Sequence, residues 1–424
     1  MRTLIISVFT LLLFACGQDE FESYLIPKGT DDIIEVSLHP NSPVLMADGK
    51  AELTFRIRAY TEVDGWQAVA YTVDGATLVR DSLFTDTVAL NTDRIPADRI
   101  RITASNGETV NGLTYSTTAA AGEVTFTCQI GNITSAPCRV QLIKPELPSF
   151  TPRTIPVVFH LMYTSNSKSI AEGVDEQFVT EVLDRLNRVF AGTYAPAPSY
   201  LDTKITFVPL EMDDKGMQLE EKGIHRVDVS SVKNDTIKKY IMGVNSVVLW
   251  KPEEILNIWV YEISSGKADS KGPKYVLDNG TEIPGLTLSV LSDPSAAKIS
   301  DPTDVGIVMP ISTLFSSKRG ASLATRFEYL FGKFFGLLDT QETGEGKYNG
   351  TDTDYCSDTY VPRYGMIGVT KRTAVVKGST EEPVYYNSYN IMESASASTT
   401  ISYEQALRIR KVMENCPLRM MQSK

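Results

Sequence analysis

Residues 329–339 read YLFGKFFGLLD, and this stretch decides how the second half of the chain is interpreted. Its apolar side chains recur at helical spacing, which predicts a helix over about residues 322–336 with one face in a core. Gly336 stands near the end of that helix, where glycine lets a chain leave because it tolerates left-handed backbone. Spacing of this kind, taken alone, is more often core than functional site.

The surrounding sequence alternates between strand and helix patterns. Residues 155–163 form a nearly continuous apolar run, which is typical of a strand buried on both faces. Apolar residues at helical spacing predict a helix over residues 174–191. Further strands are expected at residues 205–210 and 255–263, and a last helix over residues 403–413, for which Ser402 and Gln405 supply a capping box. The alternation predicts an α/β domain over residues 155–424.

Zinc proteases of the metzincin class use the motif H-E-x-x-H-x-x-G-x-x-H, in which the histidines hold the metal and the glutamate activates a water molecule. Residues 329–339 follow the form HELGHYFGLLH at its apolar and glycine positions, which are Gly332, Phe335, Gly336, Leu337 and Leu338. All four chemical positions differ. Tyr329 and Lys333 replace the first two histidines, Leu330 replaces the glutamate, and Asp339 replaces the third histidine.

Other segments extend this similarity. Residues 354–359 resemble the loop after the motif in pappalysin-like metzincins, Met392 lies in a segment that resembles their methionine turn, and residues 401–410 resemble their closing helix. With upstream matches, the resemblance covers roughly residues 155–418. The chain resembles bacterial zinc-dependent metalloproteinase lipoproteins, with a degenerate zinc-binding motif. The resemblance implies a metzincin-like zincin fold and, for intact members of the family, zinc and peptide-bond hydrolysis.

The replaced residues argue against that chemistry here. Lys333 would place an ammonium group at the metal, where it repels a dication and offers no lone pair. Leu330 cannot accept a proton from water. The three histidines of the chain, His39, His160 and His225, do not lie on this helix or at ligand spacing to one another. We therefore expect no intact catalytic residue, no bound zinc, and a pseudoenzyme that binds a peptide or protein.

Two other functions stay open, namely an active zinc endopeptidase with unusual ligands and a purely structural or adhesive surface module. A register shifted by two residues would place Glu328 at the catalytic glutamate, but it puts Phe334 at the glycine, and we reject it. A cavity shaped for a dication can also be filled by an ion pair. We therefore expect the side chains of Lys333 and Asp339 to meet, with the Tyr329 hydroxyl nearby.

The first sixteen residues form a leader with a basic start and an apolar run too short to span a bilayer. The leader ends at Ala15 and Cys16, which resemble the lipobox of bacterial lipoproteins, so Cys16 is expected to carry lipid. A plain secretory signal is the alternative. Residues 17–32 are expected to form a flexible tether, and residues 18–20 resemble the export signal of outer-surface lipoproteins. These features predict an outer-membrane lipoprotein exposed at the cell surface.

Residues 33–143 show short alternating runs separated by turn signals, which predict an all-β module. The pattern resembles bacterial immunoglobulin-like domains, and we expect a two-sheet sandwich, although a small barrel would look much the same. Residues 144–154, KPELPSFTPRT, hold three prolines and predict a linker. The chain is thus expected to have an immunoglobulin-like sandwich followed by the metzincin-like domain.

Cysteines and acidic residues suggest further sites. Four cysteines remain beside Cys16, and the possible disulfides join Cys128 to Cys138 and Cys356 to Cys416, with reduced thiols as the alternative. Calcium is possible in a loop that contains Asn349, Gly350, Asp352, Asp354 and Asp358, although a solvated acidic loop is favoured. The net charge of -11 disfavours a nucleic-acid partner.

Overall fold

The computed structural model describes residues 32–419 except 75, 234–235, 264–267, 278–279, 315–320, 341–352, 363–370, 376–383 and 394–398. The leader, Cys16 and residues 17–31 of the tether therefore lie outside the described residues, as do Asn349, Gly350 and Asp352. Among the helices that the structure describes, none has the length and hydropathy needed to cross a bilayer.

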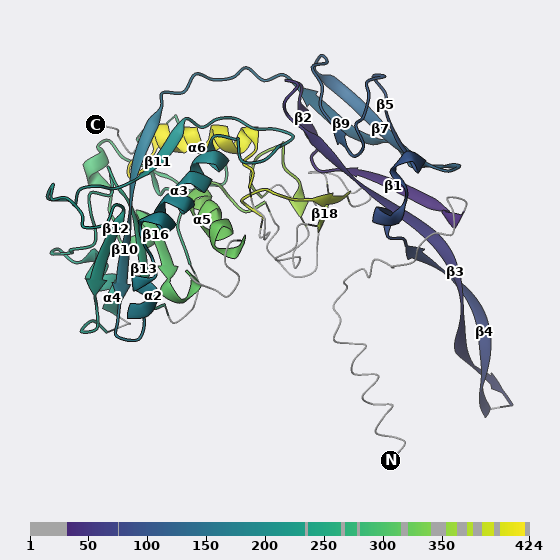
Figure 1. The fold of residues 1–424 in the computed structure, drawn as a ribbon, viewed down its shortest axis with the longest axis horizontal. Helices are drawn as coiled ribbons and strands as arrows, with labels where there is room; N and C mark the ends of the chain where they lie inside the picture. Colours follow the sequence, from purple (N-terminus) through teal and green to yellow (C-terminus); the bar gives the residue numbers. More distant parts are fainter. Residues whose placement is uncertain are drawn as a thin grey trace. The chain divides into compact units, whose positions relative to one another are not determined.

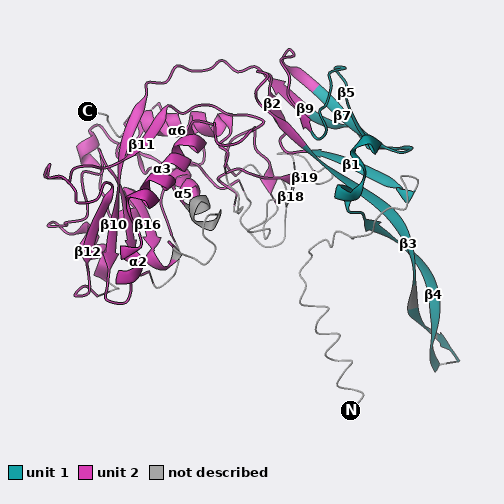
Figure 2. Cartoon of the chain, viewed as in Figure 1, with its two compact units in different colours: residues 1–39, 55–113, 124–139 teal, residues 40–54, 114–123, 140–424 magenta. Residues whose placement is uncertain are grey.

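The chain divides into two compact units, shown in different colours in Figure 2. Unit 1 comprises residues 1–39, 55–113 and 124–139, and unit 2 comprises residues 40–54, 114–123 and 140–424. These units cut through the predicted β module, because three of its segments belong to unit 2. The domain boundaries expected from the sequence stay a prediction.

Unit 1 is built from β-strands. The strand β3 (Leu53–Val73) pairs antiparallel with β4 (Ala76–Ala89), and β1 (Glu35–Pro40) lies on the other side of β3. The strand β5 (Ile100–Ala104) pairs antiparallel with β7 (Gly122–Ile130), which also pairs with β8 (Ile133–Thr134). Buried positions alternate along β7, and its Phe126 packs on Phe55 with ring centroids 4.8 Å apart. The all-β character is confirmed, and the immunoglobulin-like topology stays a prediction.

Three segments from the predicted β module pack within unit 2. The strand β2 (Val44–Met46) pairs with β9 (Cys138–Ile143), and β6 (Thr114–Tyr115) pairs with the start of β3. The Met46 N–H donates to the Pro198 carbonyl at 2.8 Å, and the Glu52 N–H donates to the Ala197 carbonyl at 3.0 Å. These backbone bonds explain why residues 40–54 belong with the C-terminal part of the chain.

The centre of unit 2 is a parallel sheet. The strand β10 (Arg153–Tyr163) pairs through its first half with β11 (Ile205–Pro209) and through its second half with β12 (Ile224–Asp228). On the other side of β10 lie β13 (Leu256–Tyr261) and then β16 (Gly306–Pro310). The strand predicted at residues 155–163 is therefore confirmed and is central. The chain first extends the sheet on one side of β10 and then on the other, which makes the boundary between β10 and β13 a switch point.

Helices cover this sheet (Figure 1). They are α2 (Lys168–Glu172), α3 (Glu176–Phe190), α4 (Ile237–Met242), α5 (Ala321–Phe334) and α6 (Tyr403–Asn415). Six apolar residues of α3 are buried, and the Asp175 side chain caps its first turn. The predicted capping box of α6 is confirmed, because Ser402 accepts from the Gln405 N–H and Gln405 accepts from the Ser402 N–H. The helices predicted from apolar spacing therefore form.

Shorter elements complete the molecule. The strands β14 (Tyr275–Val276) and β15 (Ser289–Val290) pair in parallel, and β18 (Lys371–Val375) pairs antiparallel with β17 (Val361–Pro362) and β19 (Val384–Asn387). Single turns of 3-10 helix lie at Thr92–Arg94, Ala97–Arg99, Pro294–Ala296, Pro302–Asp304 and Ile311–Thr313. Residues 144–152 have no regular secondary structure, and β10 begins at Arg153.

Candidate functional site

Aromatic packing holds α5 in the core of unit 2. Phe331, Phe334 and Phe335 are fully buried. The Phe331 and Phe207 rings meet edge to face with centroids 4.9 Å apart, and Phe335 lies 6.0 Å from Phe190 of α3. Large buried aromatic side chains contribute most of the packing energy of such a helix. The helix is thereby fixed against both α3 and the sheet.

The end of α5 is set by Gly336. Its φ is +81°, in the left-handed region that favours glycine. The Gly336 N–H donates to the Lys333 carbonyl at 2.9 Å, and the Leu337 N–H donates to the Gly332 carbonyl at 2.9 Å. These two bonds form a Schellman motif. A Cβ atom on Gly336 would also lie 2.7 Å from Val412 Cγ2, so the turn packs directly on α6. Gly336 therefore ends the helix at the place that the sequence predicts.

Beyond this turn the chain brings Asp339 back to the helix. The Tyr329 hydroxyl donates a 2.7 Å hydrogen bond to Asp339 Oδ1. Burial raises the pKa of Tyr329, and the Asp339 carboxylate raises it further. The phenol therefore stays protonated and is occupied as a donor to Asp339. Two of the four motif positions are thus joined to each other.

The predicted contact between Lys333 and Asp339 is wrong. Lys333 Nζ instead lies 3.3 Å from Asp269 Oδ1 and 5.6 Å from the centroid of the Tyr329 ring. Asp269 is held beside β16 by two backbone hydrogen bonds of 2.9 Å with Val308. The strand edge thus supplies a carboxylate to Lys333, while Asp339 is already taken by Tyr329. No ion pair joins Lys333 to Asp339 in the described structure.

The residues at these positions do not fit a zinc ion. Tyr329 is a protonated donor, Lys333 is an ion-paired ammonium group, and the Leu330 side chain is 2% exposed within the apolar core. None of these three groups presents a lone pair suited to zinc. In the part of the chain that the structure describes, no three His, Cys, Asp or Glu residues gather in a way that could hold a metal ion.

Met392 lies against the same helix. Its side chain is 1% exposed, and a Cβ atom on Gly332 would come within 2.8 Å of its sulfur. The Asn390 side chain accepts a 2.9 Å hydrogen bond from the Met392 N–H and another from the Gln405 side chain. The segment expected to be a methionine turn therefore packs under Gly332, where only a glycine leaves room for the sulfur atom.

Glu328 does not join the contacts of Tyr329, Lys333 and Asp339, and its side chain is buried in the core. Its carboxylate pairs with Arg185 of α3, which also donates to the Tyr194 hydroxyl at 2.8 Å. Burial raises the pKa of Glu328 to about 7, while Arg185 acts in the opposite direction. Because Glu328 is fully buried, it is a helix-to-helix anchor rather than a residue facing a cleft. This position agrees with our rejection of the alignment, shifted by two residues, that would make Glu328 the catalytic glutamate.

The structure brings together two histidines, His160 and His225, for which the sequence offered no signal of contact. His160 of β10 lies opposite His225 of β12 in the sheet register, and their Nδ1 atoms are 2.9 Å apart. The Asn257 amide nitrogen donates to the carbonyls of Trp250 and Ile255, so its oxygen must accept from His160 Nε2–H at 2.9 Å. His160 Nδ1 is then an acceptor for His225. Burial lowers the pKa of His160 to about 3, so the pair is a neutral internal network.

The cysteines do not form the expected disulfides. In the structure no disulfide joins Cys128 to Cys138 or Cys356 to Cys416. Burial raises the pKa of both Cys128 and Cys138 to about 12, so neither is a reactive thiolate. Cys356 Sγ lies 3.5 Å from the Asp354 carbonyl in its own loop, whereas Cys416 is packed in an apolar cluster with Val412. The last two thiols therefore occupy separate surroundings.

Two residues of the suggested calcium loop are described. Asp354 accepts from the Thr359 hydroxyl at 2.8 Å and from the Cys356 N–H at 3.2 Å. Asp358 accepts from the hydroxyls of Ser199 and Ser402 at 2.9 and 2.7 Å. These carboxylates are used as internal hydrogen-bond acceptors, which joins the loop to the start of α6. The other three residues of the suggested site lie outside the described residues.

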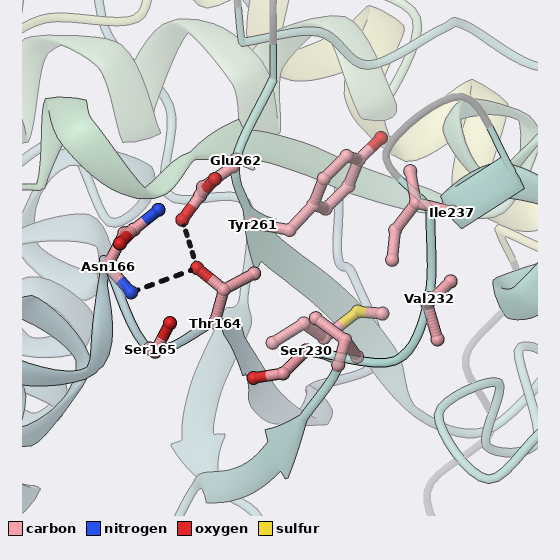
Figure 3. Close-up of a pocket in the computed structure, with 10 residues that line it drawn as sticks. Thr164, Ser165, Asn166, Ser230, Val232, Ile237, Tyr261 and Glu262 are labelled. Carbon is pink, nitrogen blue, oxygen red and sulfur yellow. Dashed lines mark hydrogen bonds between the residues drawn. The ribbon is translucent and has the colours of Figure 1, made fainter.

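A pocket of about 280 Å³ lies at the carboxyl ends of β10, β12 and β13 (Figure 3). Its apolar wall includes Met162, Val229 and Tyr261, and its polar wall includes Thr164 and Glu262. The Thr164 hydroxyl donates to Glu262 Oε1 at 2.5 Å and accepts from the Asn166 N–H at 3.3 Å. In open α/β sheets, ligands bind at the carboxyl ends of the strands where the strand order reverses. The sequence offered no local signal for this pocket.

Comparisons with known proteins give a distant structural similarity. No protein-family model matches the chain, and no curated protein matches it. Mature mirolysin of Tannerella forsythia in complex with a cleaved peptide aligns with a TM-score of 0.46 and 17% identity, over 65% of this chain and 97% of that one. A promirolysin mutant of the same organism aligns with a TM-score of 0.46 and 17% identity, over 65% of this chain and 85% of that one. Similarity at this level leaves the function to be argued from the residues of this chain.

Proposed function

We propose that this chain is a non-catalytic homologue of the metzincin metalloproteinases, anchored at the bacterial cell surface through lipid on Cys16, and that it binds a peptide or protein. One observation carries the non-catalytic part. The motif positions that hold zinc in metzincins are here occupied by a Tyr329–Asp339 hydrogen bond and a Lys333–Asp269 ion pair. These contacts satisfy the polar groups without a metal, and Leu330, at the position of the catalytic glutamate, cannot accept a proton from water.

Metal analysis of the purified protein tests this proposal. We expect no stoichiometric zinc and no chelator-sensitive cleavage of casein. The matched control restores the motif with Tyr329→His, Leu330→Glu, Lys333→His and Asp339→His together, and its zinc content shows whether these positions can form a metal site. Zinc bound by the unchanged chain, together with cleavage that a chelator abolishes, would instead establish the active endopeptidase with unusual ligands.

We further propose that the pocket beside Glu262 is a place where a positively charged peptide group binds. Thr164 occupies one carboxylate oxygen of Glu262, and no ion pair to Glu262 is present among the residues that the structure describes. A carboxylate beside an apolar wall is suited to an amine that carries an aliphatic chain, such as a lysine side chain. This pocket would give the non-catalytic homologue its binding function.

Calorimetric titration with n-butylamine, with n-butanol as the neutral comparison, tests the pocket. We expect the amine to bind and the alcohol not to bind. Glu262→Gln should abolish the difference, whereas Glu220→Gln, which removes an exposed carboxylate outside the pocket, should preserve it. If the chain binds neither compound, or binds both equally, the pocket does not recognise a cation, and the structural or adhesive alternative is favoured.

A further inference from the structure

The strands β3 and β4 form a long two-stranded ribbon in unit 1 (Figure 1). Their antiparallel register runs without interruption from the pair Tyr60 and Ala89 to the pair Val73 and Ala76. The strand β1 lies along the first part of β3, from the Asn41 N–H, which donates to the Thr54 carbonyl at 2.9 Å, to the Ile34 N–H, which donates to the Tyr60 carbonyl at 2.9 Å. An isolated pair of strands is marginally stable in water. The far part of the ribbon therefore needs further stabilisation.

Apolar side chains are exposed along this ribbon. Leu83 and Val79 of β4, which point to one face, are 54% and 65% exposed. Leu78 and Phe84 of β4 point to the other face and are 45% and 37% exposed. Strand residues alternate between faces, so both faces of the ribbon carry exposed apolar side chains. Exposed apolar side chains that gather on one element favour an interaction site there.

The outer edge of β4 is the place where a partner strand can pair. The order of the sheet is β1, β3, β4, so no described strand covers that edge. Every second residue of this 14-residue strand directs its backbone N–H and C=O groups to the outer edge, where they are available for pairing. A long, exposed and apolar edge strand is a template for pairing with another chain.

The sequence of β4 is complementary to itself. Two identical strands that pair edge to edge around a two-fold axis run antiparallel, and each residue lies opposite a residue of the same face. With Leu83 opposite Leu83 of the second copy, Arg80 lies opposite Asp86 of the second copy, and this pair occurs twice. Registers centred on Arg80, Asp81 or Asp86 would place like charges opposite each other, which is destabilising.

We propose that the chain forms a two-fold dimer in which the edges of two β4 strands pair, with Leu83 at the axis and two Arg80–Asp86 ion pairs across it. The resulting four-stranded sheet joins the β3–β4 ribbons of both copies. Opposite charges set the register, and exposed leucine and valine side chains gain neighbours across the new strand pair. The dimer does not depend on the proposed peptide binding.

Disulfide cross-linking of the full chain tests the register. Directly opposite residues of antiparallel strands have Cα atoms about 4.5–5.5 Å apart, which suits a disulfide. Under mild oxidation, Leu83→Cys should form a covalent dimer on a non-reducing gel. The matched control is Thr77→Cys, an exposed position whose equivalent in the second copy lies roughly 40 Å away along the strand. It should give no more dimer than the unchanged chain.

Charge exchange in the Leu83→Cys background tests the ion pairs. Arg80→Asp and Asp86→Arg should each reduce the amount of dimer about tenfold, because each creates two repulsive pairs. The double variant restores two attractive pairs and should recover the dimer. Equal cross-linking of Leu83→Cys and Thr77→Cys would overturn the proposal, as would a double variant no better than the single ones. Absence of any dimer would also overturn it and would favour a different partner or a lipid surface.

Discussion

At Lys333, an ammonium group stands where the zinc motif H-E-x-x-H has its second histidine, and its partner comes from a distant part of the chain. The Asp269 carboxylate lies 64 positions earlier in the sequence and reaches Lys333 because backbone bonds to Val308 hold it beside β16. The Lys333 side chain is 31% exposed and that of Asp269 is 48% exposed. Exposed pairs of this kind contribute little to stability. The ion pair therefore adds little to stability, while its ammonium group would repel a metal cation bound beside it.

Glu328 leads to a pH-dependent prediction. Its pKa is raised by burial from 4.5 to about 7, so the folded protein holds a proton that the unfolded chain has lost. Protonated Glu328 contributes its full share of the free energy of unfolding below about pH 4.5, and this contribution is lost as the pH rises to about 7. We expect the free energy of unfolding, measured with urea, to fall between pH 5 and pH 8 more steeply in the unchanged protein than in Glu328→Gln.

A matched variant separates this group from the other carboxylates. Each unit of pKa shift corresponds to about 1.4 kcal/mol, so the difference in slope is measurable. Glu220→Gln removes an exposed carboxylate and should keep the slope of the unchanged protein. If Glu328→Gln and Glu220→Gln show the same pH dependence, then the ion pair with Arg185 dominates and Glu328 is already charged at pH 5.

At the scale of elements, the turn after α5 is where helix, methionine segment and last helix meet. Gly336 has a left-handed backbone, and its Cα lies against Val412 of α6. Gly332 makes room for the Met392 sulfur one turn earlier. Both glycines serve close packing of elements around α5. Packing alone therefore accounts for a glycine at both positions.

Replacement of Gly336 by alanine tests this role. We expect Gly336→Ala to lower the free energy of unfolding by about 2–4 kcal/mol, from the left-handed backbone and from overpacking against Val412. The control is Gly216→Ala, because Gly216 also has a φ of +81° but has no atom within 4 Å of an added Cβ. It should cost about 1 kcal/mol, which is the backbone term alone. Equal losses for both variants would show that the contact with Val412 relaxes without cost.

Helix predictions succeeded at this scale because their signals are local. The apolar spacing of α3 and the capping box of α6 involve residues within a few positions of one another, so they can be read directly from the chain. The pairing of β10 with β11 through one half and β12 through the other involves residues far apart in sequence. No local pattern specifies that arrangement, because the paths of the connecting loops determine which strands become neighbours in the sheet.

At the scale of the whole molecule, the anchor on Cys16 stays a proposal that labelling can test. We expect the protein to incorporate labelled fatty acid and to fractionate with membranes. Cys16→Ser should abolish the label, since acylation needs the thiol, whereas Cys138→Ser should keep it. Label retained by Cys16→Ser would show that another residue is acylated, and a soluble unlabelled protein from the unchanged gene would show that the leader is a plain secretory signal.

The division into two units also appears only at this scale. Residues 40–54 were expected in the N-terminal module because their turn and strand signals continue those of their neighbours. In the structure, Met46 and Glu52 bind the backbone of residues 197–198, so this segment is part of unit 2. Local strand signals identify a strand but not the sheet or unit that it joins.

The sequence by itself determined where α5, α6 and the central strand form and where Gly336 ends the motif helix, because short-range spacing, caps and glycine conformation act between near neighbours. It also places Tyr329, Leu330, Lys333 and Asp339 at the four chemical positions of the zinc motif. Only the tertiary structure decided that Lys333 pairs with Asp269 rather than Asp339, and that His160 meets His225 across 65 positions. Such contacts depend on the register of the strands and on the paths of the connecting loops, which are properties of the assembled fold.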